Sequence, residues 1–446
     1  MPAQPDAGER DAMMAGRARP NWLRRKAARL RLREPRFGEA ATRRPETIRL
    51  ASDPGAPAAA PLELWVTTAP EELGAVRTLV GAVDWLRAPG RAVTVHLVSN
   101  LAGLPRRRWA TAWEGYRAAV PGLASGGGRA VACTAETVFL EDPGALLSLD
   151  MGGAAWLAGP DRRSPALLDL DALAPVWRLE DLRRGVAPAA VEARAPAGPL
   201  PAVWTQGPDS AGSEGAAGLP ASARHGQDAL ARLWRERAEA ADAAGLRLFT
   251  RERPSAEFHD LLDLYRRMHD AGAFPGQRLK HHLKPVRALI AETGARTLLD
   301  YGAGKAEGYA RLPGEAEASP MRAAEAWPGV TVRCYDPGVA AFADPGAEAV
   351  DGVISTDVLE HLSPWDVPWV LDEMFARARR FVFAVAACYP AVKTLPDGRN
   401  AHSAQMSHDW WRARMREAAR ARPGPRWRLG CDDRTAFRKW TTIYED

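Results

Sequence analysis

The chain has 446 residues, of which 46% are hydrophobic and 26% are charged, the composition of an ordinary globular protein with two or three domains. No run of about 18 apolar residues and no signal-peptide pattern occurs, so we expect a cytoplasmic protein without a transmembrane segment. The net charge of +5 follows from an arginine-rich composition, and nucleic acid is not an expected partner. The four cysteines form no C-x-x-C pair, which argues against a zinc site or a disulfide framework.

Residues 1–60 are rich in proline, alanine, arginine and glycine and show little strand pattern, which predicts a disordered tail. Arginines cluster within residues 17–36. A solvated tail is the favoured interpretation of this cluster, and contact with an acidic surface or an anionic lipid is the alternative.

Residues 61–200 have the pattern of an α/β domain. Strands are expected at 62–68 and 93–98, and a helix between them at 71–87 has its apolar residues on one face. A further helix at 109–120 and a strand-like segment at 130–140 follow. This alternation predicts a mainly parallel sheet.

The same order of elements, with the segment Val131-Ala-Cys-Thr-Ala-Glu-Thr-Val-Phe-Leu140, resembles nucleotide-sugar glycosyltransferases. In that family an acidic D-x-D motif at a strand end holds a divalent metal on the diphosphate of the donor. Here the position reads Thr134-Ala135-Glu136, with a single carboxylate, and metal–diphosphate binding needs concentrated negative charge. We therefore expect a degenerate glycosyltransferase-like domain. An active glycosyltransferase half and an unrelated α/β scaffold remain as alternatives.

Two connecting segments follow. Residues 201–226 have the glycine, serine, alanine and proline composition of a flexible linker. Residues 227–276 have helical periodicity, which predicts a helical connector or a lid over the next domain.

The segment Thr297-Leu-Leu-Asp-Tyr-Gly-Ala-Gly304 predicts a buried strand that ends in an acid and a glycine-rich turn. Gly302 and Gly304 would let a ligand lie against the main chain. The next glycine is Gly308, so the spacing departs from the G-x-G-x-x-G fingerprint of dinucleotide-binding domains. Asp300 also suits an amine-bearing ligand better than a pyrophosphate.

The next two predicted strands also end in acids. The strand at 330–335 runs into Asp336, whose carboxylate can accept hydrogen bonds from two ribose hydroxyls, although a turn before Pro337 is the plainer interpretation. The strand that begins at Asp351 runs into Asp357-Val-Leu-Glu-His361. It changes from apolar to polar at its carboxyl end, where a ligand crevice is expected in such folds.

These three motifs in this order resemble class I methyltransferases that use S-adenosyl-L-methionine (SAM). The resemblance covers residues 277–446 and implies a Rossmann-like, seven-stranded sheet that ends in an antiparallel strand pair, at about 427–431 and 437–443. It implies methyl transfer to a small molecule or a glycan, without a metal. The residues that it assigns to SAM binding are Asp300, Gly302, Gly304, Asp336 and Asp357.

An oxygen or nitrogen acceptor would need a base, and His361 and His402 are the candidates because histidine titrates near neutral pH. Structural roles for both histidines remain open. Asp397, Arg399 and Asn400, in the loop that ends at His402, are expected either to contact the substrate or to hold the loop together. A methyltransferase fold that serves only as an interaction protein is the remaining alternative.

Overall fold

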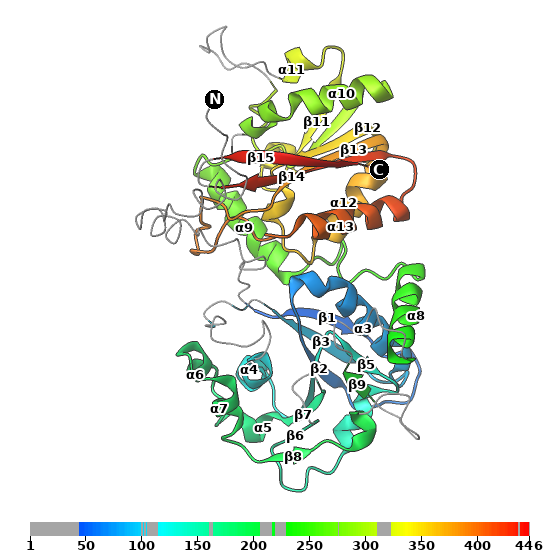
Figure 1. Cartoon of the computed structure of the whole chain (residues 1–446), viewed down its shortest axis with the longest axis vertical. Helices are drawn as coiled ribbons and strands as arrows, with labels where there is room; N and C mark the ends of the chain where they lie inside the picture. Colours follow the sequence, from blue (N-terminus) through cyan, green and yellow to red (C-terminus); the bar gives the residue numbers. More distant parts are fainter. Residues whose placement is uncertain are drawn as a thin grey trace, which may run out of the picture.

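The computed structural model describes residues 44–99, 101, 104, 115–159, 164–205, 216–218, 229–274, 276–309, 323–435 and 438–445. The chain forms two α/β halves, each built on its own mixed sheet (Figure 1). Among these residues, no helix has the length and apolar character needed to cross a membrane. The arginine cluster within residues 17–36 lies outside the described residues.

The sheet of the N-terminal half has seven strands in the order β1-β3-β2-β4-β7-β6-β8. β2 pairs in parallel with β3 and β4, whereas β1, β7 and β6 each form an antiparallel pair. The sheet is therefore mixed, and the expectation of a mainly parallel sheet was wrong. The strands are β1 (Glu46–Leu50), β2 (Leu62–Thr67), β3 (Val93–Val98), β4 (Arg129–Thr134), β6 (Trp156–Ala158), β7 (Ala166–Asp169) and β8 (Ala197–Pro199).

Helices cover both faces of this sheet. The alternation of side chains along β2 serves two cores, because Leu64 and Val66 join one apolar cluster while Trp65 joins the other. The first cluster includes residues of α3, and the second includes residues of α4. The helices are α3 (Leu73–Leu86), α4 (Tyr116–Leu123), α5 (Leu170–Leu173), α6 (Leu179–Arg183) and α7 (Pro188–Glu192).

Two expected boundaries need correction. Strand β1 lies inside the segment expected to be a disordered tail, because antiparallel pairing with β3 satisfies its backbone and Ile48 and Leu50 pack on the first core. In the expected linker, Trp204 is buried in the same core, and β9 (Ala216–Gly218) pairs with β5 (Thr137–Phe139). Residues 206–215 and 219–226 of that linker lie outside the described residues.

The sheet of the C-terminal half has six strands in the order β11-β10-β12-β13-β14-β15. The first five run parallel, and β15 is antiparallel to β14, so the antiparallel pair at the C-terminus forms as predicted. The strands are β10 (Thr297–Tyr301), β11 (Thr331–Tyr335), β12 (Val350–Thr356), β13 (Ala378–Ala387), β14 (Arg426–Arg434) and β15 (Lys439–Glu445).

Seven strands were expected in this sheet, and the described residues form six. Between β11 and β12 the chain contains two Asp-Pro-Gly turns, at Asp336 and Asp344, and a short 3-10 helix, Ala340–Phe342. Proline has no amide hydrogen for a strand ladder, which explains why this stretch does not add a strand.

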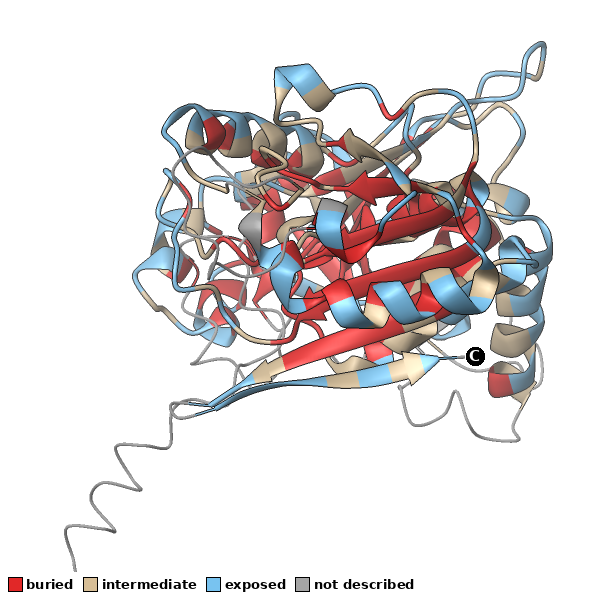
Figure 2. Cartoon of the chain, turned by 90° about the horizontal axis from the view of Figure 1, so that it is seen from above, coloured by how far each residue is buried: buried red, intermediate tan, exposed pale blue. Residues whose placement is uncertain are grey.

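Helices α12 (Val367–Arg377) and α13 (His408–Ala421) contribute to the core on one face, and α10 (Leu283–Thr293) contributes to the core on the other. The buried strands lie between helices whose outer faces are exposed (Figure 2). The short helix α11 (Ala323–Ala326) packs near α10.

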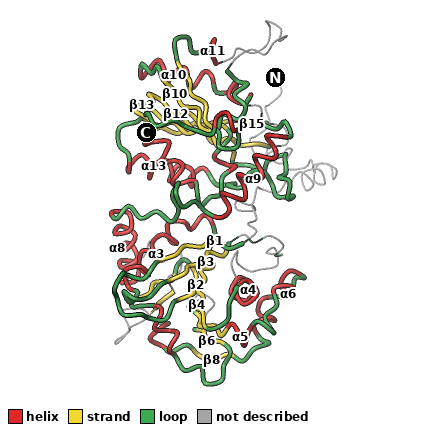
Figure 3. Tube along the Cα trace, turned by 180° about the vertical axis from the view of Figure 1, so that it is seen from behind, coloured by secondary structure: helices red, strands yellow, loops and turns green. Residues whose placement is uncertain are grey.

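The two helices of the expected connector have different partners. α8 (Ala229–Ala243) lies beside the N-terminal half and α9 (Ala256–Asp270) beside the C-terminal half (Figure 3). The carboxylate of Glu46 in β1 accepts hydrogen bonds from the backbone nitrogens of Ala256 and Glu257, at 2.7 and 2.9 Å, and so joins the N-terminal sheet to the start of α9. Burial raises the pKa of Glu46 to about 7.

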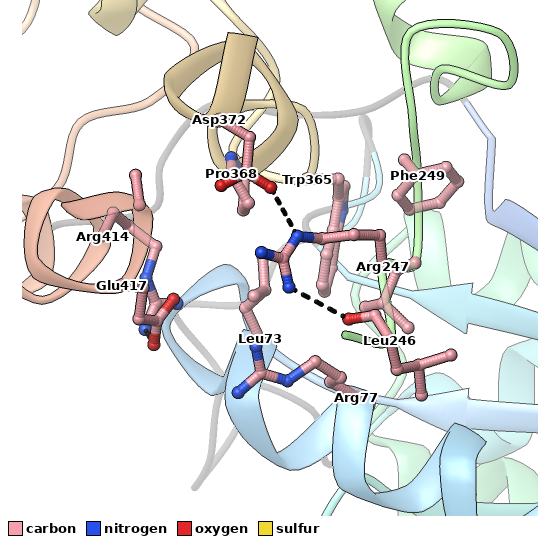
Figure 4. Close-up of a pocket in the computed structure, with 12 residues that line it drawn as sticks. Leu73, Arg77, Leu246, Arg247, Phe249, Trp365, Pro368, Asp372, Arg414 and Glu417 are labelled. Atoms are coloured by element: carbon pink, nitrogen blue, oxygen red, sulfur yellow. Dashed lines mark hydrogen bonds and ion pairs between the residues drawn. The ribbon is translucent and has the colours of Figure 1, made fainter. Parts of the chain in front are cut away.

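A second contact between the halves lies around Arg247, whose guanidinium is 2.6 Å from the carboxylate of Asp372 in α12 (Figure 4). The cavity beside this pair measures about 20 Å³. That volume accommodates about one water molecule, so it is not a candidate cofactor site.

Candidate functional site

A cavity of about 560 Å³ lies at the carboxyl ends of β10, β11 and β12, between these strand ends and α9. Its size falls within the range of small-molecule and cofactor sites. Helix α9, from the segment expected to be a helical connector or a lid, contributes Phe258, Leu261 and Tyr265 to the lining.

Three carboxylates meet at this edge because three adjacent parallel strands end there. Asp300 in β10 is in register with Cys334 in β11 and with Ile354 in β12. Asp336 and Asp357 immediately follow the last residues of β11 and β12, and all three aspartates line the cavity. The strand order thus brings together three residues, of which the first and the last are 57 positions apart in the sequence.

The turn after β10 contains two glycines that line the cavity. Gly302 and Gly304 have φ angles of +90° and +57°, a region that favours glycine. A Cβ atom at Gly302 would lie 2.4 Å from the side chain of Val358, and one at Gly304 would lie 2.6 Å from the carbonyl oxygen of Phe274. The close approach of these neighbours explains why glycine occupies both positions.

Asp336 fastens this turn to the end of β11. One carboxylate oxygen accepts a hydrogen bond from the backbone nitrogen of Gly304 at 2.9 Å, and the other accepts from Gly338 at 2.8 Å. Each oxygen keeps a second lone pair, so the carboxylate can still accept from ligand hydroxyls. His269 of α9 lies 3.8 Å away, and burial is the main cause of its lowered pKa.

Asp300 is buried and accepts a hydrogen bond of 2.5 Å from the hydroxyl of Tyr309. Burial raises its pKa to about 7, although the Tyr309 hydroxyl opposes the shift, and the charge of Asp336 adds to it. A cationic ligand would favour the ionised form of this carboxylate.

Asp357 lines the cavity but has an ionic partner of its own. It has a left-handed backbone, with φ of +55°, and the guanidinium of Arg278 donates to both of its oxygens, at 3.0 and 3.3 Å. Burial acts to raise its pKa, but Arg278, Lys439 and His282 outweigh burial and hold the pKa below the usual value. Any role in cofactor binding would include Arg278, which no sequence motif marked.

His361 and His402 both line the cavity, with their ring centroids 5.0 Å apart. Nδ1 of His361 lies 2.8 Å from the carbonyl oxygen of Ala401, and Nδ1 of His402 lies 2.5 Å from that of Tyr389. A carbonyl only accepts, so each Nδ1 carries the hydrogen and each Nε2 keeps its lone pair. Burial lowers the pKa of His361 to about 4 and also lowers that of His402.

The loop residues Asp397, Arg399 and Asn400 are not part of the cavity lining. The carboxylate of Asp397 accepts from the backbone nitrogen and from Nε of Arg399, at 3.1 and 2.8 Å, and Arg399 also pairs with the buried Glu257 of α9. The side chain of Asn400 makes two hydrogen bonds with the backbone of Ala391, at 2.9 and 2.8 Å. These side chains therefore fasten the loop, which is the structural role that the sequence left open.

Part of the cavity lining comes from segments in which the sequence showed no motif. Tyr265 and His269 belong to α9, and Arg278 belongs to the 3-10 helix Gln277–His281. The helical periodicity of this segment predicted a connector or a lid, but it could not indicate which side chains face the cavity.

In the N-terminal half, Thr134 and Glu136 are buried at the junction of β4 and β5 and do not line this cavity. No protein-family profile matches the chain, and no curated protein sequence matches it. A solved structure of the glycosyltransferase GlyE of Streptococcus pneumoniae TIGR4 is 8% identical and aligns over 75% of this chain and 94% of that chain, with a TM-score of 0.28. So weak a likeness carries no argument about fold or function.

Proposed function

We propose that the C-terminal half is a SAM-dependent methyltransferase that acts on a small molecule or a glycan. The observation that carries the proposal is the convergence of Asp300, the Gly302–Gly304 turn and Asp336 on one cavity of cofactor size. These are the residues to which the sequence resemblance assigns SAM.

The polar groups of this cavity fit the parts of the cofactor. Asp300 supplies a buried carboxylate for the amino group, and the lone pairs left on Asp336 can accept from the two ribose hydroxyls. Gly302 and Gly304 both line the cavity, so their turn contributes backbone to the proposed SAM site. SAM carries an activated methyl group, so orientation of the donor and the acceptor can supply much of the rate acceleration.

The acceptor would occupy the part of the cavity near His361 and His402. Their unprotonated Nε2 atoms, and the neutral state that their lowered pKa values imply, are compatible with the base role that the sequence predicted. The alternative, a methyltransferase fold that serves only as an interaction protein, can be distinguished by experiment, because such a protein does not need to bind SAM.

Calorimetry with SAM tests this proposal, and the chain provides a matched pair of variants. Asp336 and Asp344 both begin an Asp-Pro-Gly turn and both accept from the glycine nitrogen at 2.8 Å, but Asp344 is exposed and away from the cavity. We expect wild type to bind SAM with micromolar affinity. Asp336→Asn should weaken the binding free energy by about 1.5–3 kcal/mol, and Asp344→Asn should not change it.

The proposal fails if the folded wild-type protein does not bind SAM. Equal affinity in wild type and Asp336→Asn would instead remove the ribose assignment while leaving SAM binding in place.

A further inference from the structure

Three side chains with metal-ligating atoms lie together at the acceptor end of the cavity. Glu360 and His361 belong to the 3-10 helix Leu359–His361 after β12, and His402 ends the loop that follows β13. One ligand atom from each residue lies within 4.8 Å of the other two, and Nε2 of His402 is 4.0 Å from a carboxylate oxygen of Glu360.

Both histidines are held in the orientation that metal ligands use. Each Nδ1 bonds to a backbone carbonyl, that of Ala401 for His361 and that of Tyr389 for His402, and Nε2 is left with a lone pair. A hydrogen bond of this kind from the second ring nitrogen fixes the tautomer and the ring orientation of metal-bound histidines. The hydroxyl of Tyr265 adds a further contact, 2.8 Å from Nδ1 of His361.

Glu360 supplies the third group, and no charged side chain other than the nearby imidazoles neutralises it in the described part of the chain. The residue is fully buried, and the backbone groups of Glu360 and Ala387 beside the carboxylate offset the cost of burial only in part, because its pKa stays raised. In the described part of the chain, no lysine or arginine lies within ion-pair distance of it, and His402 is its nearest basic group. A buried carboxylate without a cationic partner is costly, and a cation between it and the two imidazoles would remove that cost.

We propose that Glu360, His361 and His402 bind a divalent transition-metal ion. Two imidazole nitrogens and one carboxylate, with further positions left open, are a ligand set used by catalytic zinc and by non-haem iron. Bonds of about 2 Å would draw the three ligand atoms roughly 1 Å closer together than they now lie. The sequence alone predicted a metal-free site.

A second cluster, Cys388, His408 and Cys431, is a weaker candidate. Nδ1 of His408 lies 2.9 Å from the hydroxyl of Tyr444, and its Nε2 lies 3.0 Å from the carboxylate of Asp433, so both ring nitrogens already have neighbours. This cluster instead provides a control for the metal-binding experiment.

The consequence for chemistry rests on the proposed methyltransferase function. A metal ion at this position would bind a hydroxyl of the acceptor and lower its pKa, so that the hydroxyl loses its proton to water. The resulting oxygen forms a bond to the methyl carbon of SAM, while the carbon–sulfur bond breaks and its electron pair stays on sulfur. We therefore assign the acceptor class as a hydroxyl compound, with the metal in place of a histidine base.

The test titrates metal-free full-length protein with Co²⁺ and follows its visible absorption. We expect one tight site in wild type and in Cys388→Ser, and a loss of affinity of roughly 100-fold or more in Glu360→Gln and in His402→Gln. The titration of wild type needs no variant and so does not depend on how well the variants fold.

The outcomes separate this inference from the proposed function. Wild type that binds SAM but no Co²⁺, or that binds Co²⁺ equally well in Glu360→Gln and His402→Gln, overturns the metal site and leaves the SAM proposal standing. Loss of the Co²⁺ site in Cys388→Ser alone also overturns it, in favour of the thiol cluster. Protein that binds Co²⁺ at Glu360 but no SAM supports the metal site and overturns the methyltransferase proposal.

Discussion

The buried carboxylate of Asp300 makes SAM affinity depend on pH. Burial raises its pKa to about 7, and only the ionised form attracts the cationic amino group of SAM. Affinity should therefore be highest above pH 7 and fall about tenfold for each pH unit below it. Between pH 8 and pH 5.5 the expected loss is roughly 30-fold, about 2 kcal/mol.

Two variants assign this dependence to Asp300. Asp300→Asn should bind SAM weakly at every pH, because its neutral amide cannot ionise. Tyr309→Phe removes the hydrogen bond that favours the ionised carboxylate, so it should move the midpoint of the profile to higher pH. His269 is the neighbouring group that could confuse the result, but its pKa is lowered, mainly by burial, so it charges only at lower pH.

The assay is calorimetric titration with SAM at half-unit steps from pH 5.5 to pH 8, with circular dichroism at each pH to confirm that the protein remains folded. A flat profile in wild type would refute the assignment of Asp300 to the amino group. The same slope in Asp300→Asn as in wild type would show that another group titrates.

Three further changes test the packing around the site. The pKa of Glu46 rises from 4.5 to about 7 on folding, so its contribution to stability is present below pH 4.5 and is lost as the pH rises through 7. Between pH 4.5 and pH 8, the free energy of unfolding of Glu46→Gln should therefore increase by about 3 kcal/mol relative to that of wild type, as measured by denaturation. A difference that does not change with pH would contradict this prediction. Arg399→Met leaves the buried carboxylates of Glu257 and Asp397 without their cation and should lower the free energy of unfolding by about 3 kcal/mol. Arg412→Met, which breaks an exposed ion pair, should change it little. Equal effects of the two variants would show that Arg399 is not needed to hold the loop and would favour the substrate role. Gly302→Ala should lower both thermal stability and SAM affinity, because the new Cβ would meet the side chain of Val358. Adding Val358→Ala should therefore restore part of the stability. If stability does not recover, the strain lies in the backbone alone.

Local sequence determined the strands and turns of the cavity edge. Apolar runs that end in Asp300, Asp336 and Asp357 predicted three strands with acids at their tips, and the structure contains β10, β11 and β12 at those positions. The glycine turn could also be predicted from the sequence, and Gly302 and Gly304 adopt backbone angles that favour glycine. Period-two hydrophobicity and glycine spacing are local properties, so a single sequence can show them.

Pairing partners and strand number were decided by tertiary structure. Strand β1 has only five residues and directly follows the tail rich in proline, alanine and arginine, and its pairing with β3 is a contact between distant segments. Likewise the count of six strands in the C-terminal sheet depends on whether the Asp-Pro-Gly stretch finds a partner.

The roles of individual side chains also depended on contacts between distant segments. The sequence placed Arg399 and Asn400 in a loop over the cavity, but the buried Glu257 of α9 and the backbone of Ala391 determine where their side chains point. His361 and His402 are 41 positions apart, and only the folded chain brings a ligand atom of each near Glu360, with backbone carbonyls beside both Nδ1 atoms. A sequence specifies which groups are available, whereas the low polarity of the folded interior decides which of them must pair and which remain free to bind a ligand.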